Sequence, residues 1–198
     1  MKFPAYVSVW IAVIWTCGFV CPSQAIEVQP TQTQVQRSLD RGKEAAAHRQ
    51  TPETLYARFG SGDDLHSGGF LVTKLGALSV LATHMALRGL EPSAADIVQV
   101  TEAPTMLVRT VILGDSPSFA VNSYMVFEQG GRIVKPTTVR VDGQAGRSSV
   151  WPKSPKFWAK VIATFRYADF DPNAQTTIIV FPASGGEVSF AVNFAEID

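Results

Sequence analysis

Residues 157–167 read FWAKVIATFRY, and this stretch decides the fold class of the protein. Small or apolar side chains alternate along it with polar ones: Ala159, Val161, Ala163, Phe165 and Tyr167 against Lys160, Thr164 and Arg166. A period of two predicts a β-strand with one buried face and one face in water. Antiparallel sheets commonly have such strands, so the stretch indicates antiparallel β structure.

Strand patterns of the same kind fill the rest of the chain after Pro104. They cover residues 106–113, 119–128, 132–135, 137–141, 176–181 and 187–194. The turn residues Gly130-Gly131 and Gly185-Gly186 separate two pairs of them and predict hairpins. Six or seven short strands predict an antiparallel β-sandwich over residues 104–198, immunoglobulin-like in the broad sense.

Helix signals dominate the preceding segment, residues 35–103. Thr51-Pro52-Glu53 is typical of a helix start and predicts a short helix to Phe59, and residues 75–88 have helical spacing. Ser93 and Asp96 form a capping-box pattern that predicts a helix over residues 94–101. The fold class is therefore α+β, with N-terminal helices packed on a C-terminal antiparallel β-sandwich. We expect residues 26–34 to be a flexible leader and residues 26–198 to form one compact unit.

The first 25 residues are typical of an export signal. A basic Lys2 precedes an apolar run over residues 5–20, and Ser23-Gln24-Ala25 places small side chains where signal peptidase cleaves. We expect export through a signal peptide cleaved after Ala25, to the periplasm or the cell exterior. An uncleaved membrane anchor and lipidation at Cys17 or Cys21 are the alternatives. Cleavage would remove both cysteines and leave no stable transmembrane segment.

No motif for a catalytic, cofactor or metal site stands out, and we assign none of the three. Asp169-Phe-Asp171-Pro-Asn173 has the spacing of a calcium loop, but Ala174 and Val180 stand where that loop needs Gly and Glu. The pattern favours a turn held by local hydrogen bonds. Residues 63–66 (DDLH) are interpreted as a wet surface loop rather than a metal site. No nucleic-acid-binding motif is present, so nucleic acid is not an expected partner.

Charge is segregated along the chain although its formal net charge is +0. Residues 131–166 contain eight basic residues and one acid, whereas residues 167–198 contain five acids and no Lys or Arg. A basic face indicates an anionic partner: an envelope protein, or an anionic glycan or lipid. Alternatively, the basic strands pair with the acidic C-terminal hairpin across one sheet. The loop over residues 142–156 is the predicted contact surface, with Arg147, Trp151, Lys153 and Lys156 as the contact residues.

These observations favour an exported, non-catalytic binding or assembly component of the cell envelope. The alternative is a secreted or periplasmic hydrolase with a dispersed active site. A solvent-exposed Trp151 on a basic face would favour the binding component, and a pocket with converging polar side chains would favour the enzyme.

Overall fold

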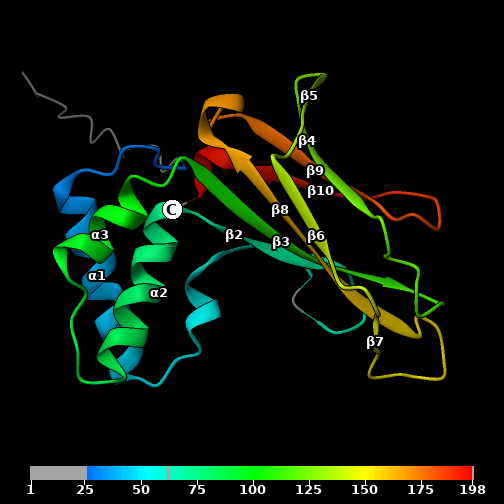
Figure 1. Cartoon of the computed structure of the whole chain (residues 1–198), viewed down its shortest axis with the longest axis horizontal. Coiled ribbons are helices and arrows are strands. Elements are labelled where there is room, and N and C mark those ends of the chain that lie inside the picture. Colours follow the sequence, from blue (N-terminus) through cyan, green and yellow to red (C-terminus); the bar gives the residue numbers. More distant parts are fainter. Residues whose placement is uncertain (1–25, 62, 198) are drawn as a thin grey trace, which may run out of the picture.

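The computed structural model describes residues 26–61 and 63–197. In this part of the chain, two antiparallel sheets pack face to face and three α-helices gather at one end of them (Figure 1). The protein is α+β, as expected from the sequence. The expected signal peptide and its cleavage site after Ala25 lie outside the described residues, apart from Ile26 on the far side of that site.

The larger sheet, sheet A, is built around two ten-residue strands that pair along their whole length. These are β3 (Thr105–Gly114) and β8 (Phe157–Arg166), the latter being the strand predicted from its alternation. The strand order is β1-β2-β3-β8-β6, with β7 also pairing with β8. The remaining strands are β1 (Ala57–Gly60), β2 (Gly68–Val72), β6 (Thr138–Val141) and β7 (Gly146–Arg147).

The second sheet, sheet B, has the strand order β10-β9-β4-β5. Its strands are β4 (Tyr124–Gln129), β5 (Arg132–Val134), β9 (Gln175–Phe181) and β10 (Val188–Asn193). The two predicted hairpins, β4–β5 and β9–β10, are confirmed. Gly130 and Gly131 in the first turn have φ of 57° and 83°, a backbone conformation that L side chains rarely adopt.

Aromatic rings join the two sheets in the core. The ring of Phe127 from β4 stacks on that of Phe165 from β8, with 3.7 Å between the ring centroids. Phe170 and Phe194 meet Phe127 edge-on at 5.6 Å and 5.4 Å. Such pairs add about 0.5–1.5 kcal/mol each beyond the area they bury. The inner faces of the two sheets therefore form the main hydrophobic core, and the outer face of sheet A faces away from it.

The helices are α1 (Gln32–Ala47), α2 (Lys74–Ala86) and α3 (Ala94–Thr101). The capping box of Ser93 and Asp96 is present, which confirms the helix predicted there. Helices α1 and α2 pack closely because Gly42 has no side chain: a Cβ there would lie 2.2 Å from the carbonyl oxygen of Ser79. No helix in residues 26–61 or 63–197 is long and apolar enough to cross a membrane.

The segment predicted to be mostly helical, residues 35–103, also supplies two strands of sheet A. The start signal at Thr51 produces only a 3-10 turn, η1 (Pro52–Leu55), and β1 follows where the sequence predicted helix. Strand pairing prevails because it places Phe59 in the core, where its ring meets that of Phe190 at 5.1 Å. The second strand, β2, begins at Gly68, directly after the stretch that contains the predicted surface loop of residues 63–66.

The leader expected to be flexible, residues 26–34, is held at both ends. Ile26 is buried with 2% of its surface exposed, and its N–H donates to the Phe194 carbonyl at 3.2 Å. Helix α1 already begins at Gln32, capped by Thr31. The polar composition of the leader hid this, because a single buried side chain leaves no periodic pattern in a sequence.

Candidate functional site

The predicted contact loop, residues 142–156, is fastened to the body of the protein at several points. The Asp142 carboxylate accepts from the Lys160 main-chain N–H at 2.9 Å, and the Ser148 N–H donates to the Lys156 carbonyl at 2.9 Å. Asp115, from the turn after β3, accepts from the Ser154 hydroxyl at 3.0 Å. These bonds give the loop a defined conformation, so its exposed side chains are held at fixed positions on the surface.

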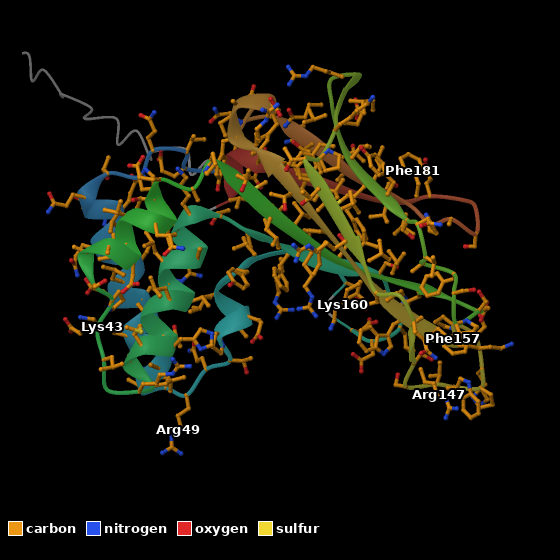
Figure 2. All side chains as sticks on the ribbon, viewed as in Figure 1. Lys43, Arg49, Arg147, Phe157, Lys160 and Phe181 are labelled. Atoms are coloured by element: carbon orange, nitrogen blue, oxygen red, sulfur yellow. The ribbon has the colours of Figure 1, made fainter. Side chains whose placement is uncertain are left out.

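Three of the predicted contact residues are cations, and the fourth is an exposed indole. The Arg147 guanidinium lies over the ring of Trp151, 4.4 Å from its centroid, while Trp151 keeps 45% of its surface exposed. Lys153 and Lys156 are exposed on the same loop. Figure 2 shows Arg147 beside Phe157 at one end of the sandwich. Lys43 and Arg49 lie at the opposite end, with the helices. The loop therefore forms a basic, partly aromatic tip of the molecule.

Beside this loop, the outer face of sheet A carries a row of alternating cationic and apolar side chains. Register pairs place five residues directly across the strands from β1 to β6: Arg58, Phe70, Arg109, Ile162 and Arg140. The Arg109 guanidinium lies 5.1 Å from the Phe70 ring centroid, and Tyr56 stacks on Phe70 at 4.9 Å. Lys160 lies two residues before Ile162 on β8 (labelled in Figure 2), and its Nζ is 5.3 Å from the ring centroid of Trp158.

A groove of about 710 Å³ opens on this face and connects the row to the loop. Arg58 and Arg109 line one part of it, and Arg147 lines the part next to the loop. Its remaining wall includes hydroxyl, carboxylate and imidazole groups: Glu53, Ser61, Asp63, Asp64, His66, Ser148 and Ser149. Cations, hydrogen-bond acceptors and hydroxyls thus converge on one hollow, which neither the loop nor the sheet row forms alone.

The cations of this face have no internal carboxylate partner among the residues that the structure describes. Ion pairs within 4.0 Å in that part of the chain join Lys43 to Glu91, His66 to Asp63 and Arg166 to Asp169. The alternative that the basic segment pairs with the acidic C-terminal hairpin is therefore wrong for Arg140 on β6, Arg147 on β7 and Lys160 on β8. The topology explains this, because these strands belong to sheet A and the hairpin β9–β10 belongs to sheet B.

The exception, Arg166, belongs to a second and shallower hollow of about 540 Å³ together with Arg132 and Lys135. Its Nε donates to the Asp169 carboxylate at 2.9 Å, and Arg132 donates to the main-chain carbonyl of the same residue. Both arginines are thus engaged within the protein. This part of the basic segment serves the turn after β8 and is a weaker candidate for a binding surface.

Ser61, Asp63, Asp64 and His66 lie on the rim of the groove, and the side chain of Asp63 holds its neighbours in place. The Asp63 carboxylate contacts His66 Nδ1 at 2.8 Å and accepts from the Leu65 N–H at 2.8 Å and the Ser61 hydroxyl at 2.9 Å. The bond to His66 first, and then those to Leu65 and Ser61, lower the pKa of Asp63 to about 2. No three His, Cys, Asp or Glu side chains of the described residues gather to hold a metal ion.

The other carboxylate-rich stretch, residues 169–173, is a local turn, as predicted. The Asn173 N–H donates to the Asp171 carboxylate at 2.8 Å, and the Asp171 N–H donates to the side chain of Gln129 at 2.9 Å. The first of these bonds is that of an Asx turn, and the second ties the turn to β4.

Two residues of the groove, Arg58 and Arg109, were missed by the sequence argument. Arg58 lies in a segment interpreted as helix, and Arg109 is a lone charge in an otherwise apolar strand. A signal for Arg109 existed: it stands between the buried Val108 and Thr110, so the alternation of β3 points it outward. What no local pattern could indicate is that β1, β3 and β7 place three arginines around one groove.

Comparison with known proteins gives only distant likenesses. No family model and no curated protein matches the sequence. Among solved structures, the archaellum periplasmic stator protein FlaG from Sulfolobus acidocaldarius is 18% identical with a TM-score of 0.31, covering 45% of this chain and 86% of that chain. The complex of FlaF and FlaG from the same organism gives 20% identity and a TM-score of 0.30, covering 45% of this chain and 77% of that chain. Likenesses at this level carry no argument about fold or function.

Proposed function

We propose that this protein is an exported, non-catalytic binding or assembly component of the cell envelope, which holds an anionic partner against its basic loop and sheet face. The observation that carries the proposal is the set of cations without internal carboxylate partners on one side of the molecule, ending in the exposed pair of Arg147 and Trp151. Unpaired cations on a structured surface attract and orient an anionic partner. Export rests on the signal-peptide pattern of residues 1–25.

The test is a crosslinking pull-down of the tagged protein from native envelope and medium fractions, read by mass spectrometry. The triple variant Arg147→Gln, Lys153→Gln and Lys156→Gln removes the charge of the loop. Its matched control, Arg37→Gln, Arg41→Gln and Arg88→Gln, removes the same charge from exposed positions on α1 and in the turn after α2. We expect one dominant partner that the loop variant loses and the control keeps, with weaker capture as salt is raised. Capture that is equal in all three proteins would refute the proposal.

A second candidate function, a hydrolase, is favoured by one specific observation. Asp63 and His66 form a carboxylate–imidazole pair at the rim of the groove, with Nδ1 engaged and Nε2 left for a proton transfer. Ser149 lines the same groove and carries the exposed hydroxyl that such a pair would have to activate, whereas the buried Ser148 hydroxyl donates to the Pro155 carbonyl. Labelling with a fluorophosphonate probe tests this, with His66→Ala and Ser149→Ala as variants. Labelling that both variants abolish would establish the enzyme, and no labelling would remove it.

A further inference from the structure

The groove on sheet A has two ends lined by arginine, and Lys160 lies beside the stretch between them without lining it. At one end, Arg58 and Arg109 stand on the same register row, both paired with Phe70. At the other end lies Arg147, which pairs with Phe157, the partner of Gly114 on β3. Arg109 and Gly114 are five positions apart on one strand, so the two ends are separated by about 17 Å along the strand direction.

The floor between these ends is uncharged where the groove crosses β1, β2 and β3. Gly60, Gly68 and Val111 occupy one register row there, and Lys160 on β8 continues this row next to Val111. At Gly68 the Ser61 carbonyl oxygen takes the place of a side chain, since a Cβ there would lie 2.2 Å from it. The groove runs over this backbone and Val111, so an extended molecule can lie along it from one cationic end to the other. A single small anion would occupy only one end and leave the rest of the groove unused.

The rim identifies the chemistry of that molecule. Asp63, Asp64 and Glu53 are carboxylates beside the groove, and Ser149 supplies an exposed hydroxyl, whereas the hydroxyls of Ser61 and Ser148 donate to Asp63 and to the Pro155 carbonyl. Carboxylates accept hydrogen bonds from hydroxyl groups but repel closely spaced negative charges. A polyphosphate, or a peptide made of acidic residues, would meet that repulsion along its length. A glycan presents many hydroxyls to such a rim and carries its acid groups at intervals, where guanidinium groups bind carboxylates in a bidentate manner.

We infer that the groove binds an extended carboxylated glycan, with acid groups held by Arg58 and Arg109 at one end and by Arg147 at the other. This inference rests on the proposed function and names the class of its partner. The Asp64 and Glu53 carboxylates of the rim accept hydrogen bonds from the sugar hydroxyls in between. Binding on a sheet face suits a glycan, whereas peptides that add to sheets bind at a strand edge through main-chain hydrogen bonds.

The test is isothermal titration of the purified protein with hexagalacturonate, at low and at moderate salt. The matched ligand is the fully methyl-esterified hexasaccharide, which keeps the sugars and loses the charges. We expect binding of the acid form only, weakened about 10-fold or more in the double variant Arg58→Gln and Arg109→Gln. Val111→Trp fills the floor without changing charge, and we expect it to abolish binding. The charge control Arg37→Gln and Arg41→Gln should bind as the unmodified protein does.

Three results would overturn the inference, and circular dichroism first establishes that each variant is folded. Poly-L-glutamate or phosphatidylglycerol vesicles binding while hexagalacturonate does not would make the partner a peptide or a membrane. Glycan binding that survives both the arginine double variant and Val111→Trp would place it outside the groove. A pull-down partner lost with Lys153 and Lys156, together with no glycan binding at all, would leave the proposed function standing and remove this inference alone.

Discussion

Lys74 ties three parts of the protein together, and its replacement is the most informative test of how the fold is held. Its side chain is 7% exposed at the first position of α2, and its Nζ donates to the Val28 carbonyl at 2.8 Å and to the Thr101 carbonyl. The same ammonium lies 5.2 Å from the ring centroid of Tyr167, in the turn after β8. The leader, the end of α3 and the sandwich thus meet at one charged group.

The expected cost of Lys74→Met follows from these contacts. A hydrogen bond to a charged group contributes about 1.5–3 kcal/mol, and this variant loses two of them and leaves two carbonyls unpaired. Burial of the ammonium works in the opposite direction and lowers the pKa of Lys74, while Glu102 raises it to a smaller extent. Methionine retains most of the apolar stem. We therefore expect a net loss of about 2 kcal/mol in the free energy of unfolding.

Urea unfolding measures this loss. With a denaturant slope of about 2 kcal/mol per molar, the midpoint should fall by about 1 M. Tryptophan fluorescence reports on the sandwich and far-ultraviolet circular dichroism on the helices, and we expect both to shift together. A loss below about 0.5 kcal/mol, within the range of ordinary surface substitutions, would refute the view that Lys74 is a structural tie. Lys74→Arg, which keeps the charge but not the compact ammonium, serves as the conservative comparison.

The pH dependence has a defined sign. Because the folded-state pKa of Lys74 is below its ordinary value of 10.5, the unfolded chain binds more protons between the two values. The contribution of Lys74 to stability therefore rises with pH through that window. The cost of Lys74→Met should be smallest near neutral pH and should grow as pH approaches 10.5. A cost that shrinks over this range would contradict the assigned direction of the pKa.

Three further predictions concern other sites. Gly42→Ala should destabilise the protein by about 1–3 kcal/mol in urea unfolding, because its Cβ would collide with the Ser79 carbonyl and force α1 and α2 apart. The Asp63 carboxyl should titrate at about 2 by NMR, and His66→Ala should raise its pKa toward 3.8. In the unmodified protein, the stabilisation from the Asp63 hydrogen bonds should be fully present above pH 3.8 and should be lost as pH falls through about 2. Tyr167→Phe should leave the free energy of unfolding unchanged or raise it, since the buried hydroxyl makes no hydrogen bond of normal geometry. Burial raises the pKa of Tyr167, so the unmodified protein should lose stability as pH rises above 10, and the variant should lose less.

Each of these has an outcome that would contradict it. Gly42→Ala with unchanged stability would mean that the two helices can separate without loss. A normal carboxyl pKa for Asp63 would mean that its bond to His66 does not persist in solution. A Tyr167→Phe variant that loses more than about 1 kcal/mol would show that the hydroxyl has a partner after all.

Patterns confined to one strand, hairpin or cap were read correctly from the sequence. The alternation of residues 157–167, the glycine turns of the two hairpins and the capping box at Ser93 all act over a few residues, so neighbouring side chains reveal them. Strand β1 was missed because its four residues follow a strong helix-start signal, and only the distant Phe190 makes a strand the better choice for Phe59. Burial of Ile26 depends on Phe194 in the same way.

The residues of the candidate site also fall into those that the sequence could indicate and those that only the fold brings together. Arg147, Trp151, Lys153 and Lys156 could be proposed as contact residues because they share one basic segment of the chain. Arg58 and Arg109 could not, since they come from two strands that become neighbours of that segment only when sheet A forms. The predicted alternative of charge pairing with the C-terminal hairpin was wrong for these strands for the same reason, because sequence adjacency does not decide which sheet a strand joins.

By itself, the sequence determined the α+β class, most strands, the caps and turns, and the segregation of charge, because each depends on side-chain periodicity or backbone preference over a short stretch. Only the tertiary structure decided which strands pair, and hence that three arginines, a glycine floor and a rim of hydroxyls and carboxylates surround one groove. Strand pairing is chosen by the burial of the whole apolar surface in a shared core, and that free energy is a property of the assembled sheets rather than of any one segment.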